Sequence, residues 1–497
     1  MDALYLIDFY KVGHVSQYPQ DTTQVWSNWT PRSTRVAGPD SVVFFGLQYF
    51  LKKVLEEDWS EFFHTPLHLV LDEYREVIKS TLGVDDPRTD HIEALHAIGH
   101  LPIDIYALPE GVSSPLGVPQ LVITNTHPSA FWLPNYLETI LSACLWKPST
   151  SATTAKRYRQ LFTKYALEAG ETDLSFIDWQ GHDFSMRGMS GVEDAILSGM
   201  GHLLSFSGTD TIPAILAAEE YYGASLTCGG SVPATEHSVM CAGSQDGEFE
   251  TFRRIIKDVY PKGVVSIVSD TWDLWKVLTD YVPRLRDEIL ERDGKVVIRP
   301  DSGDPVNIIC GDRSLRYAGN PYGTGTPEPP AFYGTLNLLA QALGVDARRP
   351  GLPLINKAGA IYGDSITVDR ADKILGRIVH ELGLSPYNMV FGIGSYTYEY
   401  VTRDTYGFAM KATAVRRGGE IIPIFKKPVT DNGEKVSHKG IPAVYRTEDS
   451  TDEKPKFFCV QGSTPEALDN CAFLKVYSNG KISVEHTFDE IRKRVRA

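Results

Sequence analysis

The sequence lacks the long apolar stretches that cross a membrane. None of its 497 residues lies in an apolar run of the roughly 20 positions that a membrane-spanning helix needs. The first ten residues also lack the basic start of a secretion signal, and they carry Asp2 and Asp8. We therefore expect a cytoplasmic protein that has no membrane partner.

Closely spaced cysteines are missing as well. The six cysteines are scattered, and no two of them stand in the CxxC spacing that is typical of zinc sites and redox motifs. Scattered positions also argue against the disulfide framework of small extracellular domains. The cysteines therefore favour a reducing compartment, and the sequence shows no set of protein metal ligands.

Positive charge is in deficit, because 63 acidic residues face 49 basic ones and the formal net charge is -14. Such a chain repels a polyanion, so nucleic acid is not an expected partner, and an anionic ligand needs a local cluster of Arg and Lys. Neither GxGxxG nor GxxxxGK[ST] stands near the glycine-bearing segment FGIGS at residues 391–395. A dinucleotide-binding fold and a P-loop are therefore not supported.

What the sequence does contain, between residues 174 and 395, is an alternation of short apolar runs with helix-period stretches. Doubly apolar strands joined through helices indicate a parallel sheet that is buried on both faces, either closed as a barrel or open. About seven such units occur, close to the eight of a complete barrel, so we predict an α/β fold with an incomplete β/α barrel. The predicted helices include 212–222, 249–259, 274–290 and 368–384.

The two ends of the chain differ from this middle part. Residues 1–150 show an α+β pattern, and residues 405–497 are rich in short strands separated by turn residues. We predict that the tail packs with the N-terminal region as one α+β domain beside a barrel over 151–404. The segment 319–330 is rich in Gly and Pro and is predicted to be a surface loop. Strands are expected at 42–45, 103–107 and 121–125, and helices at 46–55 and 132–145.

Charged side chains follow nearly every predicted barrel strand. Because the carboxyl ends of barrel strands form the active-site face, these side chains are expected to meet at one mouth. A single Asp at such a place commonly caps the next helix, but the whole set suits a sugar phosphate better than a glycosidase, which has less need of phosphate-binding groups. The set comprises Asp183, Arg187, Asp210, Glu236, His237, Asp270, Arg299, Asp301 and Asp364.

Blocks of sequence along almost the whole chain resemble the nicotinamide phosphoribosyltransferases, which are dimeric type II phosphoribosyltransferases. The blocks include IDFYKVGHVSQYP, VVFFGLQYFL, PIDIYALPEG, HDFSMRG, GTDT, SVPATEHS, VSDTWD, IRPDSGDP and FDEIRK. The resemblance implies transfer of the phosphoribosyl group of 5-phosphoribosyl-1-pyrophosphate (PRPP) to nicotinamide, giving nicotinamide mononucleotide for NAD salvage. It also implies a homodimer with shared active sites, Mg2+ bound to pyrophosphate, and ATP that phosphorylates a histidine and stimulates turnover.

The resemblance assigns the nicotinamide pocket to five residues. Phe184, and Tyr10 of the partner subunit, are similar to rings that stack on the base, although aromatic side chains alone are more typical of core packing. Asp210 would lie near the carboxamide nitrogen and Arg299 near its oxygen, with Arg187 beside them.

Other residues are assigned to the pentose, the phosphates and the phosphorylated histidine. His237 resembles that histidine, with Asp270 as its orienting partner, and Asp301 completes the expected catalytic set. Ser395 and Tyr396 stand where the family has glycines, so the 5'-phosphate site departs from its pattern. The residues expected around ribose and the phosphates are Arg32, Asp301, Gly363, Asp364, Gly394, Ser395, Arg403, Lys411 and Lys426.

Two alternatives remain at this stage. A nicotinate phosphoribosyltransferase would share the barrel and the chemistry, but the carboxylate of Asp210 would repel an acidic base. A dimer that binds the ligand without catalysis is the other, and the joint presence of Arg299, Asp301 and His237 argues against it.

Overall fold

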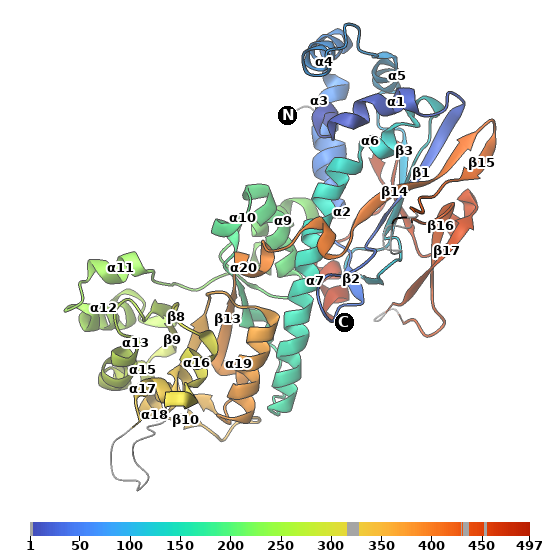
Figure 1. Cartoon of the computed structure of the whole chain (residues 1–497). Helices are drawn as coiled ribbons and strands as arrows, with labels where there is room; N and C mark the ends of the chain where they lie inside the picture. Colours follow the sequence, from blue (N-terminus) through green and yellow to red (C-terminus); the bar gives the residue numbers. More distant parts are fainter. Residues whose placement is uncertain (1–2, 316–327, 429, 431–436, 452–454) are drawn as a thin grey trace. The chain divides into compact units, whose positions relative to one another are not determined.

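The computed structural model describes residues 3–315, 328–428, 430, 437–451 and 455–497. The chain forms two compact units (Figure 1). The terminal unit comprises Met1–Thr153, Leu216–Ser225 and Val401–Ala497, and the barrel unit comprises Thr154–Ile215 and Leu226–Tyr400. Most of the loop predicted at 319–330 lies outside the described residues.

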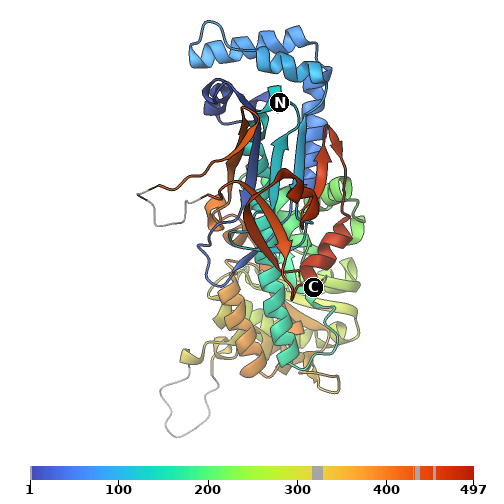
Figure 2. The same cartoon turned by 90° about the vertical axis from the view of Figure 1, so that its right-hand side faces the viewer.

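The terminal unit is built on a seven-stranded sheet with the order β15-β14-β1-β5-β3-β18-β19. Every neighbouring pair in it is antiparallel. Strands from the C-terminal tail lie beside strands from the N-terminal region, since β14 pairs with β1 and β18 pairs with β3 (Figure 2). The strands are β1 (Thr22–Thr30), β3 (Ile103–Ala107), β5 (Leu121–Asn125), β14 (Ala409–Arg417), β15 (Glu420–Pro423), β18 (Leu474–Ser478) and β19 (Lys481–Ile482).

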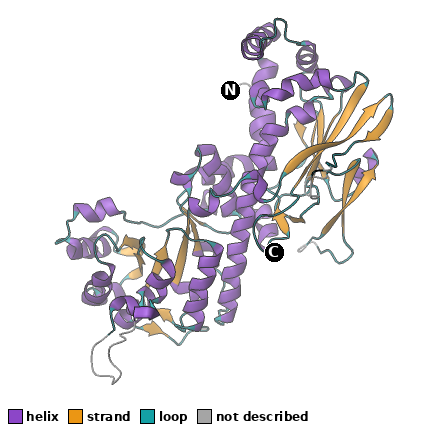
Figure 3. Ribbon diagram, in the orientation of Figure 1, coloured by secondary structure: helices purple, strands orange, loops and turns teal. Residues whose placement is uncertain are grey.

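Helices and two small ribbons complete the terminal unit (Figure 3). The ribbons pair β2 (Ser41–Val43) with β4 (Ser113–Pro115), and β16 (Ile441–Arg446) with β17 (Phe457–Ser463). The long helix α7 (Glu138–Glu168) has residues in both units. The other helices are α1 (His14–Gln17), α2 (Leu47–Tyr49), α3 (Trp59–His64), α4 (Leu67–Leu82), α5 (Asp90–Ile98), α6 (Leu133–Tyr136) and α21 (Phe488–Arg496).

The barrel unit is built on a six-stranded parallel sheet with the order β7-β6-β13-β12-β9-β8. All five neighbouring pairs are parallel, which confirms the predicted α/β class. The core is apolar on the strands themselves, with Ile267, Ile298 and Phe391 fully buried. The strands are β6 (Gly181–Asp183), β7 (Gly208–Thr209), β8 (Lys262–Val268), β9 (Asp293–Arg299), β12 (Ala358–Tyr362) and β13 (Met389–Ile393).

A segment without regular strand structure links the two edge strands of this sheet. Gly230 makes a parallel bridge to Gly208 of β7, and Ala234 makes one to Ser266 of β8. One of the about seven predicted strand-and-turn units, SLTCGGSVPATEHS at residues 225–238, therefore appears as isolated bridges only. Pro233 accounts for this difference, because proline has no N–H to donate to a sheet ladder.

The helices of the barrel unit follow the strands. In α19 (Val368–His380) the buried residues Ala371, Ile374, Leu375 and Ile378 recur at helical spacing, as predicted. The segment predicted as a helix over 274–290 is helical over that range except at Leu285, but it is not one regular α-helix. It consists of α13 (Leu274–Lys276), a π-helical segment (Val277–Tyr281), α14 (Val282–Arg284) and α15 (Arg286–Leu290), and Pro283 lies in the first turn of α14.

Most of the remaining elements lie in the barrel unit, and α10 has residues in both units. No helix among the described residues is long and apolar enough to cross a bilayer. The elements are α8 (Ile177–Gln180), α9 (Val192–Leu203), α10 (Ile212–Tyr222), α11 (His237–Ala242), α12 (Glu248–Arg254), α16 (Pro305–Cys310), α17 (Pro330–Tyr333), α18 (Thr335–Leu343), α20 (Ser395–Tyr398), β10 (Val345–Asp346) and β11 (Leu354–Ile355).

Candidate active site

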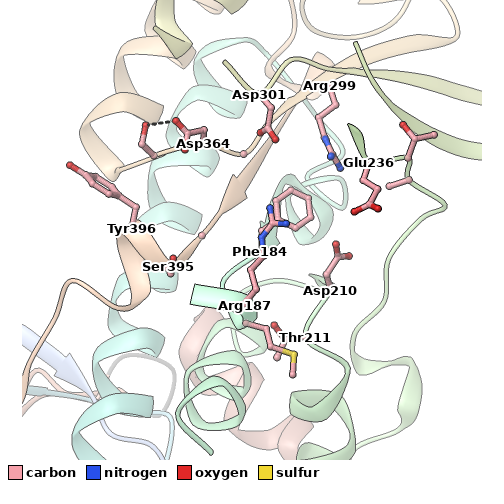
Figure 4. A pocket seen from close by; sticks show the side chains of 16 residues that line it. Phe184, Arg187, Asp210, Thr211, Glu236, Arg299, Asp301, Asp364, Ser395 and Tyr396 are labelled. Carbon is pink, nitrogen blue, oxygen red and sulfur yellow. Dashed lines mark hydrogen bonds between the residues drawn. The ribbon is translucent and has the colours of Figure 1, made fainter. Parts of the chain in front are cut away.

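A cavity of about 850 Å³ opens at the carboxyl ends of the barrel strands (Figure 4). Phe184 follows β6, Asp210 follows β7 and Asp364 follows β12, so strand ends that are far apart in the sequence meet at one place. The cavity is lined by Phe184, Met186, Arg187, Asp210, Thr211, Ala234, Thr235, Glu236, Arg299, Asp301, Gly363, Asp364, Ser365, Gly394, Ser395 and Tyr396.

Phe184 places an aromatic ring in the middle of this cavity (Figure 4). Its backbone N–H donates to the carbonyl of Ile393 over 3.0 Å, which ties the residue to the end of β13. A Cβ at Gly392 would lie 2.4 Å from Phe184 Cδ2, and one at Gly363 would lie 3.1 Å from the same atom. Two glycines therefore make the space that the ring occupies.

Asp210 is held by two hydrogen bonds that reach the same carboxylate oxygen. His182 Nε2 lies 2.9 Å from Asp210 Oδ1, and Ser231 Oγ donates to Oδ1 over 2.6 Å. Burial raises the pKa of this carboxyl, but the hydrogen bonds from His182 and Ser231, together with nearby positive charge, lower it below its ordinary value. The positive charge of Arg299 also lowers the pKa, so the carboxyl titrates below its ordinary range and is ionised at neutral pH.

The backbone around Asp210 is fixed by a carboxylate beneath the cavity. Asp183 is fully buried, and its Oδ2 accepts hydrogen bonds from Thr211 Oγ1 at 2.8 Å and from Thr209 Oγ1 at 3.3 Å. Its carbonyl accepts from the N–H of Asp210 at 3.0 Å. The expectation that Asp183 faces the mouth was wrong, because its carboxylate is used to hold the two residues that flank Asp210.

Arg299 lies between two carboxylates of the cavity. Burial lowers the pKa of its guanidinium, and the charges of Asp301 and Asp210 oppose that shift. Its Nε is buried and has no hydrogen-bond partner among the residues that the structure describes. Arg299 lines the cavity, so its guanidinium can donate hydrogen bonds to a ligand oxygen there.

The pKa of the Asp301 carboxyl is raised, and burial is the largest cause. The charge of Arg299 opposes this shift and the charge of Asp270 adds to it. The Asp270 carboxylate points to the loop at residues 301 and 302. Its Oδ2 accepts hydrogen bonds from the backbone N–H of Asp301 at 2.9 Å and from Ser302 Oγ at 2.6 Å. Asp270 therefore supports the loop that carries Asp301.

His237 is exposed and is the first residue of α11. Its Nδ1 lies 3.3 Å from Thr271 Oγ1. The expected pairing of His237 with Asp270 is replaced in this structure by a contact with the next residue, because the Asp270 carboxylate is turned to the loop at Asp301.

Another part of the cavity lining combines the carboxylate of Asp364 with the hydroxyl groups of Ser365 and Ser395 and with Gly394. Ser365 Oγ donates to Asp364 Oδ2 over 3.3 Å, and Ser365 has a φ of 51°, which is strained for a residue with a side chain. Gly394 is the N-cap of the short helix α20, and Ser395 is its first residue. A Cβ at Gly188 would lie 2.2 Å from Ser395 Oγ, so glycine is required there.

Four of the five residues expected from the terminal unit, Tyr10, Arg32, Arg403 and Lys411, interact electrostatically in one cluster that includes Glu138. Lys411 Nζ lies 3.7 Å from Glu138 Oε1. Burial lowers the pKa of Lys411, Glu138 opposes that shift, and the like charges of Arg32 and Arg403 add to it. Tyr10 is 62% exposed, and Arg403 and Glu138 both act on its hydroxyl. Lys426 is also exposed, and its backbone bonds to Ser437.

Sequence reasoning missed several residues of the site. Thr211 and Thr235 line the cavity, and His182 and Ser231 hold Asp210. His182 and Thr211 stand next to predicted residues in the blocks HDFSMRG and GTDT, which was the available signal. No group of three or more His, Cys, Asp or Glu residues in the described ranges is arranged to hold a metal ion.

The chain matches two family models over different parts of its length. Residues 179–463 match the nicotinate phosphoribosyltransferase (NAPRTase) family, and residues 2–105 match the N-terminal domain of nicotinamide phosphoribosyltransferase. The chain is 46% identical to the nicotinamide phosphoribosyltransferase of Acinetobacter baylyi, over 100% of this chain and 97% of the relative. It is 34% identical to the nicotinamide phosphoribosyltransferase of Mycoplasma pneumoniae, over 85% of this chain and 92% of that protein.

Solved structures share the fold at low sequence identity. The crystal structure of human nicotinic acid phosphoribosyltransferase has a TM-score of 0.58 and 16% identity, covering 98% of this chain and 92% of that one. Nicotinate-nucleotide pyrophosphorylase from Pyrococcus furiosus has a TM-score of 0.57 and 16% identity, covering 99% and 94%. The sequence matches and the fold agree: this chain belongs to the nicotinate phosphoribosyltransferase (NAPRTase) family and carries the N-terminal domain of nicotinamide phosphoribosyltransferases.

Proposed function

We propose that this protein transfers the phosphoribosyl group of PRPP to the ring nitrogen of nicotinamide, releasing pyrophosphate, as a step of NAD salvage. The observation that carries the proposal is the ionised Asp210 carboxylate in the same cavity as the ring of Phe184 and the guanidinium of Arg299. A carboxylate accepts a hydrogen bond from a carboxamide and repels a carboxylate. The names of the Acinetobacter and Mycoplasma relatives support the same substrate.

The residues of the cavity suit a reaction in which positioning dominates. The pyridine nitrogen of nicotinamide has no proton to lose, so its attack needs no general base. The ring of Phe184 orients the base by stacking, and the Arg299 guanidinium donates to the carboxamide oxygen. Asp301 and Asp364 accept from the ribose hydroxyls and face the positive charge that develops on the pentose as pyrophosphate leaves.

The pyrophosphate requires cations, and the terminal unit offers Arg32, Arg403, Lys411 and Lys426 for it. Arg32 and Arg403 lie close enough to Lys411 to lower the pKa of its ammonium group, after the larger effect of burial, so these three cations form one positively charged cluster that can attract an anion. Mg2+ enters with PRPP, bound mainly by oxygens of the substrate itself. Gly394 and Ser395 take the 5'-phosphate at the end of β13.

The functional form is a homodimer in which each active site uses both subunits. Tyr10 of one protomer stacks on the nicotinamide that lies against Phe184 of the other. The exposure of Tyr10 supports this role, because a large aromatic ring that is 62% exposed is available to a partner. The absence of disulfides among the six cysteines, all of which the structure describes, supports a reducing, cytoplasmic location.

ATP stimulates turnover by phosphorylating His237. The imidazole is exposed, and a phosphate on it would add negative charge that the cations of the pyrophosphate site can pair with. Incubation with ATP should place an acid-labile phosphate on the protein and raise kcat/KM for PRPP severalfold. The variant His237→Ala should show neither change, and ATP stimulation that persists in this variant would refute the role of His237.

The substrate is tested by measuring pyrophosphate release with nicotinamide and with nicotinate under the same conditions. The wild type should prefer nicotinamide, and Asp210→Asn should reduce that preference by roughly tenfold, because the charge that repels the acid is gone. A wild-type preference for nicotinate would establish the acid-specific alternative. Binding of nicotinamide without release of pyrophosphate from PRPP would establish a non-catalytic protein.

A further inference from the structure

We infer that His182 and Ser231 are positioning residues that set the selectivity for an amide over an acid, acting through Asp210. The inference rests on the proposed function and deepens it. Both side chains approach Oδ1 of Asp210, at 2.9 Å and 2.6 Å, so the second carboxylate oxygen is left to accept the carboxamide N–H. Neither residue needs to touch the base for this effect.

The arrangement of the three side chains excludes a hydrolytic triad. In a triad the serine and the carboxylate bond to opposite nitrogens of the histidine. Here Ser231 Oγ lies 3.4 Å from His182 Nε2, the same nitrogen that lies 2.9 Å from Asp210. The serine and the histidine are thus two donors that converge on one acceptor, which is an arrangement for holding a carboxylate in its ionised form.

His182 also contacts the ring that stacks on the base. The centroid of its imidazole lies 4.7 Å from that of the Phe184 ring, at an interplanar angle of 48°. One side chain therefore fixes both the stacking surface and the amide acceptor. A shift of His182 would disturb their relative position and release one of the two hydrogen bonds on Asp210.

Gly208 makes room for this imidazole on the neighbouring strand. It pairs with His182 across β6 and β7, and a Cβ at residue 208 would lie 2.7 Å from His182 Nδ1 and 3.1 Å from the carbonyl of Gly181. No side-chain atom fits there without movement of the ring. Gly208 thus leaves the space that His182 needs in order to contact Asp210.

Steady-state kinetics with nicotinamide and nicotinate test the inference through the ratio of the two kcat/KM values. His182→Leu removes the donor, so the ratio should fall about tenfold or more. His182→Gln keeps an N–H donor with similar reach and should hold the ratio within about threefold of the wild type. Ser231→Ala, at an exposed position, should also lower the ratio and does not threaten the fold.

Gly208→Ala distinguishes an effect through His182 from a general disturbance. Alone, this change should lower the ratio, because its methyl group displaces the imidazole. In the His182→Leu background it should lower the ratio no further, since contacting residues that act through one group are not additive. His380→Gln, at an exposed histidine paired with Glu168, is the matched control and should leave the ratio unchanged.

The outcomes separate this inference from the proposed function. A wild type that prefers nicotinate would overturn the proposed function. A wild type that prefers nicotinamide, with the same ratio in His182→Leu and in Ser231→Ala, would overturn the inference alone. A loss of kcat with an unchanged ratio in both variants would likewise assign the two residues a purely structural role.

Discussion

Replacing Arg299 by Leu is expected to lower kcat/KM for nicotinamide by on the order of a thousandfold at neutral pH. Removing one preorganised donor that acts in the transition state costs about 2.7–4 kcal/mol, and each 1.36 kcal/mol is a factor of ten in rate. Arg299 interacts with both Asp210 and Asp301, so its loss leaves two carboxylates without their cation. The proposed hydrogen bond from the guanidinium to the carboxamide oxygen is lost at the same time.

The same variant should shift the acidic limb of the pH profile. The positive charge of Arg299 lowers the pKa of Asp210 and also that of Asp301, whose net pKa is raised by burial. Without that charge both pKa values rise. Because both carboxyl groups act in their ionised forms, the activity of Arg299→Leu should be lost at a higher pH than that of the wild type as the pH falls.

The measurement is kcat/KM for both substrates from pH 5 to pH 8. The control is Arg348→Leu, because Arg348 is an exposed arginine of the barrel unit that pairs with Asp346 on the surface. The control should retain the activity and the pH profile of the wild type. Activity of Arg299→Leu within tenfold of the wild type would contradict the role assigned to the guanidinium.

Replacing Tyr10 by Ala is expected to lower kcat/KM by roughly a hundredfold while the dimer persists. A stacked aromatic pair contributes about 0.5–1.5 kcal/mol beyond area burial, and covering a large ring contributes about 1.5–3 kcal/mol more. Tyr10 is exposed within its own chain, so its removal leaves no cavity that would destabilise the fold. Size-exclusion chromatography with light scattering establishes the oligomeric state, and the assay gives the loss.

Coexpression of two inactive variants tests whether the site is shared. If Tyr10 serves the partner's pocket, a mixed dimer of Tyr10→Ala and Arg299→Leu has one intact site, because the pocket of the first chain receives the ring of the second. Random pairing then restores about a quarter of the wild-type activity, as two-fold symmetry requires. Phe184→Ala with Arg299→Leu is the matched control, since both changes lie in one pocket and no pairing restores it.

No recovery of activity in the first mixture, with mixed dimers demonstrated by differential tags, would mean that Tyr10 serves its own chain or none. Full activity of Tyr10→Ala by itself would remove the residue from the site. The first result would contradict the sharing of the site between subunits, and the second would contradict any role of Tyr10 in the site.

Much of the secondary structure was predictable from local patterns. The strands at 103–107 and 121–125 and the helix at 212–222 have the predicted bounds. Residues that follow barrel strands, such as Phe184, Asp210 and Asp364, line one cavity, because parallel strands bring their carboxyl ends to one edge. Pro233 marks the place where a predicted strand was interrupted.

The sequence by itself determined which elements form, since spacing of apolar residues and the positions of proline and glycine act over a few neighbours. Only the tertiary structure decided where each polar side chain points. Asp183 faces inward to Thr209 and Thr211, and Asp270 faces the loop at Asp301, although both follow or end a strand in the same way as the residues of the cavity. Their orientations depend on donors supplied by distant segments, and such long-range hydrogen bonds leave no local pattern in the chain.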